Sequence, residues 1–169
     1  NDYSSADYYY VNKSSLPKVY GGFNTSLSWK GFDLSAIFAY SIGGYIYNRD
    51  ITMILHNGSL EGRDWSTEIL KRWTPDNRYT DVPALSTTSN NWNSASTRFL
   101  QNNSYMRLKN LTLSYNLPKQ WISKLSLSSV QVYVQGDNLF TIHRNQGLDP
   151  EQGITGITYY RYPAMRTIS

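Results

Sequence analysis

The sequence has 169 residues, of which 40% are hydrophobic, 15% are aromatic and only 17% are charged. Its net charge of +4 is spread along the chain without a basic block, so we expect no nucleic acid among its partners. Cysteine is absent, which excludes disulfides, thiolate metal sites and a cysteine nucleophile within these residues.

The apolar residues are too dispersed to form a membrane-spanning helix. No run of about 18 apolar residues occurs, so no transmembrane helix is predicted. A membrane-spanning strand needs only about 9–11 residues, half of them apolar. The composition is therefore compatible with a β-barrel membrane protein.

The first expected structure is a long β-hairpin. After a polar segment, residues 1–17, the sequence alternates between apolar and polar residues from Val19 to Gly44. Lys30 and Gly31 interrupt the alternation with the composition of a two-residue turn. The two arms have roughly the length that crosses a bilayer.

A long irregular stretch follows, over residues 44–103. Within it Trp65, Ile69 and Trp73 recur at helical spacing, which predicts one short helix with Asp64 as its N-cap. A connection of this length is uncommon inside a compact soluble domain and usually has a function.

The second half of the chain returns to strand patterns. Strict alternation over residues 110–117 predicts a strand with two chemically different faces. A short turn or helical elbow is expected over residues 118–125, then a fourth strand over residues 128–140. A second long loop, residues 141–162, precedes the start of a possible fifth strand.

Short turns and long loops thus alternate along the chain. This pattern is typical of an outer-membrane barrel, an all-β antiparallel fold with short periplasmic turns and long extracellular loops. In that fold the apolar face meets lipid and the polar face lines the lumen. The residues expected to face lipid are Leu27, Phe38, Leu111, Leu113, Tyr115 and Val132. The residues expected to face the lumen are Ser26, Ser35, Thr112, Ser114 and Gln131.

Aromatic residues near the strand ends support the same interpretation, because membrane barrels carry aromatic girdles at both interfaces. The residues concerned are Trp29, Phe32, Tyr40, Tyr105, Tyr115 and Trp121. A soluble sandwich with ordinary turn-flanking aromatics is the alternative. Four or five strands cannot close a membrane barrel, whose smallest form has about eight strands, so we expect a piece of a larger protein.

Six motifs in order carry a family resemblance: "LPKVYGGFNTSLSWKGFDLSAIFAYSIGG", "RWTPDN", "RFLQNNSYMRLKNLTLSYNLPKQW", "VQVYVQGDNLFT", "GLDPE" and "YPAMRT". Together they resemble the C-terminal portion of the SusC/RagA family of TonB-dependent outer-membrane transporters. The resemblance implies that residues 1–169 belong to the C-terminal part of a barrel of about 22 strands. We expect the plug domain, the segment that contacts TonB and most strands to lie outside these residues.

The family also implies the function and the partners. Such a protein, in the outer membrane, would import oligosaccharides or peptides with an extracellular lid lipoprotein of the SusD type, driven by the TonB complex. The alternative from a different class is a soluble all-β carbohydrate-binding or adhesin module. Extraction separates the two, because only the transporter needs detergent.

Enzyme chemistry is not expected. His56 and His143 both lie in loop-like stretches, and no G-x-S-x-G nucleophile motif occurs. Asp149 and Glu151, in "GLDPEQG", are too few to form a Ca²⁺ site, and a structural turn is the better interpretation. The sequence predicts no cofactor and no metal.

The candidates for substrate or lid contact are aromatic residues of the long stretch: Trp65, Trp73, Tyr79 and Trp92. Aromatic faces can stack on sugar rings, although such residues also pack loops together. We expect the stripe formed by the first two tryptophans and Ile69 to anchor the short helix. The tip around residues 87–94 would then help to form a rim for the lid.

Overall fold

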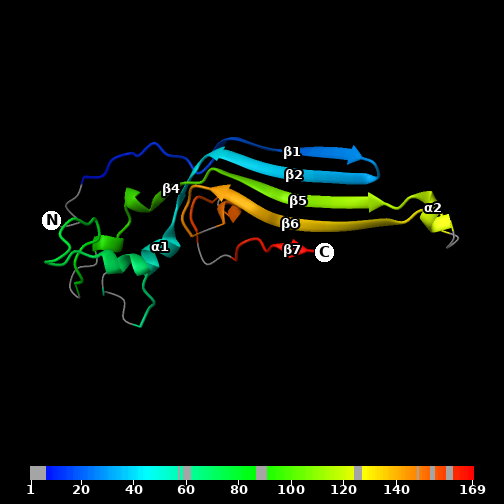
Figure 1. Cartoon of the computed structure of the whole chain (residues 1–169). Helices are drawn as coiled ribbons and strands as arrows, with labels where there is room; N and C mark the ends of the chain where they lie inside the picture. The colour runs from blue at the N-terminus through cyan, green and yellow to red at the C-terminus, as the bar shows by residue number, and fades with distance from the viewer. Residues whose placement is uncertain are drawn as a thin grey trace. The chain divides into compact units, whose positions relative to one another are not determined.

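Five strands form one antiparallel sheet whose order follows the chain. The computed structural model describes residues 7–56, 58, 62–86, 91–123, 127–147, 149–152, 155–158 and 162–169. The sheet order is β1 (Pro17–Trp29), β2 (Phe32–Gly43), β5 (Tyr105–Asn116), β6 (Gln131–His143) and β7 (Thr167–Ile168) (Figure 1). This confirms the all-β antiparallel prediction. The sheet is open, and no closed barrel is seen in this part of the chain.

The predicted hairpin is present, and its turn has the expected chemistry. Trp29 pairs with Phe32, so Lys30 and Gly31 alone form the loop. Both have positive φ, 47° and 88°, as the twist-matched I′ turn of a two-residue hairpin requires. The turn is also held to the neighbouring strand, because the N–H of Asn116 donates to the Gly31 carbonyl at 2.8 Å.

Strand register gives the sheet two uniform faces. Leu27 pairs with Leu34, which pairs with Leu113 on the next strand. In the adjacent row Ser26 pairs with Ser35, which pairs with Thr112. Because successive residues of a strand point to opposite faces, one face is apolar and the other polar across several strands.

A β-bulge at Lys109 shifts the alternation of side chains by one residue near the N-terminal end of β5. Phe38 pairs with Leu108 and Ile37 pairs with Asn110, so the register against β2 skips Lys109. The skip exchanges odd and even positions in the first part of β5. Leu108 therefore stays on the apolar face, opposite Phe38.

The facing strand β6 is irregular at the same level. Asn110 pairs with Asp137 and Leu108 pairs with Phe140, so Asn138 and Leu139 have no partners in the ladder. Asn138 adopts a positive φ of 52°, a conformation that asparagine tolerates better than most residues. The irregularities coincide, and the polar and apolar faces continue past them on both strands.

One predicted girdle residue, Tyr105, is on the wrong face. Tyr105 pairs with Ser41 and His143 and therefore lies on the polar face, whereas Tyr40 lies on the apolar face as expected. The physical reason is the bulge at Lys109, which reverses the parity that holds in the rest of β5.

Aromatic residues gather at the turn end of the sheet. The rings of Phe32 and Tyr115 lie 4.4 Å apart, and the ammonium of Lys30 lies 4.9 Å from the ring centre of Trp29. The expected elbow between β5 and β6 contains helix α2 (Lys119–Ile122), whose Trp121 is 63% exposed. Residues 124 and 125 of that elbow lie outside the described residues.

Several residues of the sheet show the reverse of the burial expected in a soluble protein. On the apolar face Leu27, Leu113 and Val132 are 67%, 43% and 60% exposed. On the polar face Arg107 and Ser114 are only 3% and 8% exposed. Contiguous exposed apolar surface marks a site that meets another protein or lipid.

Residues 44–103 are more ordered than the sequence suggests. They contain β3 (Tyr45–Tyr47), α1 (Arg49–Ile54) and β4 (Leu100–Asn102), with 3₁₀-helices at Thr67–Lys71, Asn91–Asn93 and Thr97–Phe99. With neighbouring segments they form a compact unit, here called the loop unit (Asn1–Ser15, Tyr45–Gln101, Gly153–Arg161), separate from the sheet unit. Buried residues of the loop unit include Ile46, Leu55, Ile69, Val82 and Phe99.

The predicted helix is shorter than expected and has a different cap. It is the 3₁₀-helix Thr67–Lys71, and Ser66 rather than Asp64 is its N-cap, accepting a hydrogen bond from Glu68 N–H at 3.3 Å. Side chains end it: Asn77 and Thr80 both donate to the Lys71 carbonyl, at 2.9 and 2.6 Å. None of the described helices is long and apolar enough to span a membrane.

The hairpin turn gives a direct test of this fold. Gly31→Val should lower the free energy of unfolding of the full-length protein by about 1–3 kcal/mol, because a β-branched residue is strained at positive φ. A Cβ at this position would also approach the Asn116 carbonyl to 3.2 Å. Lys30→Asn, which suits a positive φ, is the control and should change stability by less than about 0.5 kcal/mol. Equal effects in urea unfolding would contradict the assigned turn.

Candidate functional site on the polar face of the sheet

The five residues predicted to face the lumen share the polar face. Ser26, Ser35 and Thr112 lie in one row across β1, β2 and β5. Ser114 lies two residues further along β5, and its hydroxyl accepts a hydrogen bond from the Gln131 amide of β6 at 3.0 Å. The structure therefore groups all five, as the alternation predicts.

Carboxylates on this face are satisfied by hydrogen bonds from neighbouring strands. Near the turn end, Asp33 accepts from the Ser28 hydroxyl at 2.5 Å and from the Asn116 amide at 2.8 Å. Near the bulge, Asp137 accepts from Asn110 at 2.7 Å and from Thr167 at 3.1 Å. Such cross-strand bonds fix the register from the polar side.

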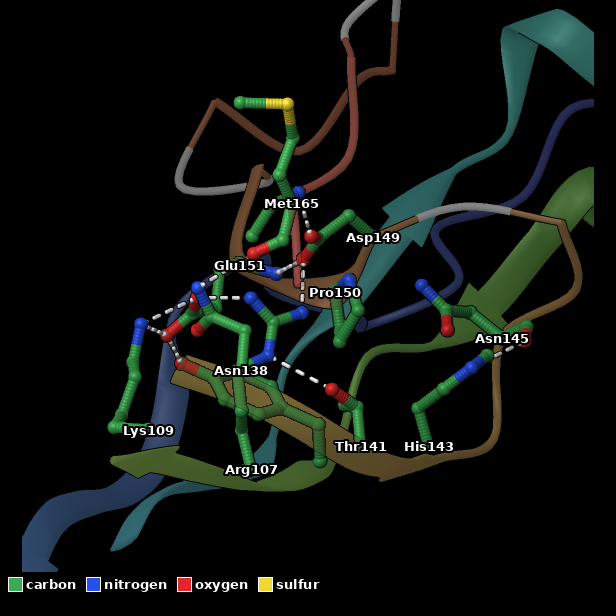
Figure 2. A network of polar contacts seen from close by, with 12 residues as sticks. Arg107, Lys109, Asn138, Thr141, His143, Asn145, Asp149, Pro150, Glu151 and Met165 are labelled. Carbon is green, nitrogen blue, oxygen red and sulfur yellow. Dashed lines mark hydrogen bonds and ion pairs between the residues drawn. The ribbon is translucent and has the colours of Figure 1, made fainter. Parts of the chain in front are cut away.

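Arg107, at the loop end of β5, contacts two carboxylates (Figure 2). Its Nη2 lies 2.6 Å from Asp149 Oδ1, its Nη1 lies 2.5 Å from Glu151 Oε2, and its Nε donates to the Thr141 hydroxyl at 2.8 Å. The side chains of Arg107 and Asp149 are both only 4% exposed. Arg107 therefore bridges two carboxylates with one nitrogen on each, and its ion pair with Asp149 is buried.

Glu151 joins a second cation and a phenol to the cluster. Lys109 Nζ lies 2.7 Å from its carboxylate, and the Tyr105 hydroxyl donates to it at 3.4 Å. Both donors come from β5, like Arg107. Two cations therefore face two carboxylates, Asp149 and Glu151, and the cluster carries no net charge.

Asp149 is stabilised in its ionised form. Burial opposes its charge, but hydrogen bonds from Ala164 N–H, from the Arg107 guanidinium and from Glu151 N–H outweigh that effect, so its pKa lies below the ordinary value. The carboxylate thus stays charged at neutral pH.

A recess of about 310 Å³ opens beside the cluster. Its walls combine strand residues such as Thr141 and His143 with residues of the following connection, among them Pro163 and Arg166. Within the described residues, no three His, Asp or Glu side chains lie close enough together to hold a metal ion. Because cations of the chain occupy the carboxylates of "DPE", these residues have the structural role that the sequence favours.

Trp65, one of the four predicted contact residues, forms a hydrogen bond within the loop unit. The Nε1–H of Trp65 donates to Nδ1 of His56 at 3.0 Å, and the two rings meet edge to face. His56 is fully buried, whereas the Trp65 side chain is 43% exposed. In the expected stripe Ile69 is buried, at 3% exposed, and Trp73 remains 45% exposed.

The other two candidates have contrasting environments. The half-buried ring of Trp92 stacks under the Arg98 guanidinium, with 3.3 Å between Cζ and the ring centre. Tyr79 is 102% exposed, on the turn that follows the 3₁₀-helix. The structure does not bring the four candidates into a single site. Residues 87–90 of the expected tip lie outside the described residues.

A hollow in the loop unit was not predicted from the sequence. It encloses about 410 Å³ and is lined by Tyr8, Tyr9, Val11, Tyr47 and Leu100, among others. The run of tyrosines near the start of the sequence was the available signal, but tyrosine runs alone do not indicate a concave surface.

Several known proteins are similar to this chain. The TonB-dependent receptor P3 of Formosa agariphila is 34% identical over 159 residues, which cover 88% of this chain and 15% of that protein. The TonB-dependent receptor SusC of Bacteroides thetaiotaomicron is 28% identical over 159 residues, 94% of this chain and 15% of that protein. The chain thus spans about 15% of the length of these curated relatives. No family model matches the chain.

Solved structures agree with these sequence relatives. A structure of the RagAB peptide transporter matches 92% of this chain with a TM-score of 0.80 and 36% identity, covering 17% of the matched chain. The closed-closed and open-open states of the RagAB peptide importer match with TM-scores of 0.79 and 0.77. The chain belongs to the SusC/RagA family of TonB-dependent receptors.

In this SusC/RagA segment, the sequence pattern alone does not connect the motif "GLDPE" with its partner Arg107. The available signal was the pair Arg107 and Lys109 immediately before a strictly alternating strand. Without the bulge, the strict alternation of β5 would place Arg107 on the apolar face. The sequence alone therefore does not predict its contact with Asp149 and Glu151.

The Trp65 hydrogen bond predicts an asymmetry between two tryptophans of the loop unit. Trp65→Phe should reduce the free energy of opening of this unit by about 1–3 kcal/mol, because it leaves a buried ring nitrogen of His56 without its donor. Trp73→Phe is the matched control, since no hydrogen bond of that indole is seen. Native-state hydrogen exchange of residues 45–56 in the full-length receptor measures the difference. A larger loss in Trp73→Phe would contradict the structural role of Trp65.

Proposed function

We propose that residues 1–169 form the C-terminal part of the barrel of an outer-membrane, TonB-dependent importer. The observation that carries the proposal is the likeness to the RagAB peptide transporter over 92% of this chain, at 36% identity. An independent physical argument supports it: the sheet exposes its apolar face and covers part of its polar face. Lipid on one side and water on the other side would satisfy both faces.

The polar face suits a hydrated passage. Apart from the clustered charges, it presents neutral hydrogen-bonding groups, including Ser26, Ser35, Thr112 and Gln131. Such groups can interact with polar solutes without strong charge selection. We propose oligosaccharides or peptides as the substrates, with recognition depending mainly on other parts of the protein.

The proposed partners follow from the family. A lid lipoprotein of the SusD type would close the extracellular side, and the TonB complex would act through a segment outside these residues. The short turns, at Lys30–Gly31 and after Pro118, would lie on the periplasmic side. The loop unit would lie outside and form part of the rim on which the lid sits.

Tyr79 is the best candidate for contact with the lid. It is fully exposed, yet its turn is well ordered by side-chain bonds from Asn77 and Thr80 to the Lys71 carbonyl. Tyrosine is enriched among the residues that dominate interfaces.

Import by the whole receptor is the central test. Deleting its gene should abolish uptake of labelled oligosaccharides or labelled peptides, and the full-length protein should restore it only while the TonB complex is intact. The receptor should also need detergent for extraction. Uptake that survives the deletion, or restoration without TonB, would sink the proposal.

The assignment of faces makes a quantitative prediction. Leu113→Arg should destabilise the receptor in lipid by up to roughly 2–4 kcal/mol, because it places a charge on the lipid face. Ser26→Arg, in the adjacent row but on the exposed polar face, should cost much less. Ser114 is a poorer control because it is buried. Comparable losses of folding into vesicles for both variants would refute the assignment.

The proposed rim predicts a local defect in lid binding. Tyr79→Ala should weaken binding of the lid lipoprotein by about tenfold, while Tyr79→Phe, which keeps the ring, should weaken it far less. The measurement is co-purification of the lid with the receptor, with heat-modifiable migration as a check on barrel assembly. Unchanged lid capture in Tyr79→Ala would remove Tyr79 from the interface.

A further inference from the structure

Two short segments after β6 are fastened to the polar face of the sheet. We call them the latch, residues 149–152 and 162–166. The first contains Asp149 and Glu151, and the second contains Ala164 and Met165. Figure 2 shows both approaching the same patch of β5 and β6.

Arg107 makes the principal attachment. Two of its nitrogens contact the latch, at 2.6 Å to Asp149 and at 2.5 Å to Glu151, and the third is fixed by Thr141 of β6. The bonds on both sides of the guanidinium hold its plane in place. Because the pair is almost fully buried, removing either partner leaves an uncompensated charge.

Asp149 connects the two parts of the latch. Its Oδ1 accepts the backbone N–H of Glu151 at 3.0 Å, and its Oδ2 accepts the N–H of Ala164 at 2.8 Å. Asn138, in the irregular part of β6, donates to the Met165 carbonyl at 3.1 Å. One carboxylate therefore holds the first segment, the second segment and the strand together.

The first segment is also held by asparagines. The Asn103 amide donates to the Pro150 carbonyl at 2.9 Å, and the Asn145 amide donates to the Asn103 side-chain oxygen at 3.2 Å. Asn145 is only 4% exposed. These bonds would not be expected of a connection that moves freely in solvent.

We propose that the latch is a fixed inner lining of the transport passage, that Arg107 is its positioning residue, and that import requires it to stay fastened. This inference rests on the proposed function, because only then is the polar face the lumen wall. A released latch would extend from the wall into the passage and expose unpaired charges to the solute. The charge balance of the closed cluster keeps this part of the wall neutral.

Hydrogen exchange of the purified full-length receptor tests the fastening without any transport assay. Arg107→Gln and Asp149→Asn should each speed exchange at Glu151 and Ala164 by at least about tenfold, because both amides depend on the Asp149 carboxylate. Exchange in β1 and β2 should not change. Unchanged exchange at both amides in both variants would overturn the latch.

Lys109→Gln is the matched control for charge loss. The Lys109 side chain is 36% exposed, and its partner Glu151 keeps Arg107, so exchange at the latch should change less than about twofold. Should Arg107→Gln fail to assemble, Asp149→Asn still decides, since its change lies in the connection and not in a barrel strand. The double variant should exchange no faster than the faster single variant, because both remove the same pair.

Uptake by the same variants tests the role in import. Per assembled receptor, Arg107→Gln and Asp149→Asn should import at least about fivefold more slowly, with lid binding unchanged and Lys109→Gln close to the parent. Faster exchange with full import would overturn the requirement for fastening. A parent receptor that imports nothing would instead overturn the proposed function, and exchange would still decide whether the latch is fastened.

Discussion

The rest of the structure depends on strand register, which keeps apolar side chains on one face of the sheet and polar side chains on the other. Alternation within one strand is a local property, but a continuous face requires every neighbouring strand to keep register. Here the skipped residue of β5, Lys109, and the skipped residues of β6, Asn138 and Leu139, coincide. Between β5 and β6 the ladder is therefore interrupted at one level, and both faces continue beyond it. A bulge in β5 alone would have mixed leucines with asparagines along the pair.

The same bulge places the charge of Arg107 on the polar face, beside its carboxylate partners. Arg107 lies on the polar face only because the parity of β5 reverses at Lys109. Under the proposed function the apolar face meets lipid, and a charge there near the end of the strand would cost up to about 1 kcal/mol. On the polar face it finds Asp149 and Glu151, in a connection that Asn103 and Asn138 also hold to the sheet. The bulge and the buried ion pair are thus parts of one arrangement.

The sequence predicted what local signals encode. The hairpin at Lys30–Gly31 and the grouping of Ser26, Ser35 and Thr112 on one face were predicted correctly, because turn chemistry and strict alternation depend on neighbouring residues. The pairing of Arg107 with Asp149 was missed, since the residues are 42 positions apart and the bulge between strands hides their common face. The cap at Asp64 was wrong because Ser66 caps the helix locally, and the side chains of Asn77 and Thr80 bond the carbonyl at its C-terminal end. Tyr105 failed as a girdle residue for the same reason as Arg107.

The exposure of side chains on the two faces of the sheet argues against a soluble module more strongly than the amino-acid composition does. A soluble sheet would need a second layer on its apolar face, where transfer from water is worth roughly 1.5–3 kcal/mol for each large side chain. This chain instead places its buried ion pair on the polar face and leaves residues such as Leu27 and Val132 exposed. Exposed leucines such as Leu27 beside a covered ion pair are unfavourable in water and favourable in a bilayer. The segment matches the closed-closed and open-open states of the RagAB peptide importer almost equally, with TM-scores of 0.79 and 0.77, so the likeness does not depend on which of the two states is compared.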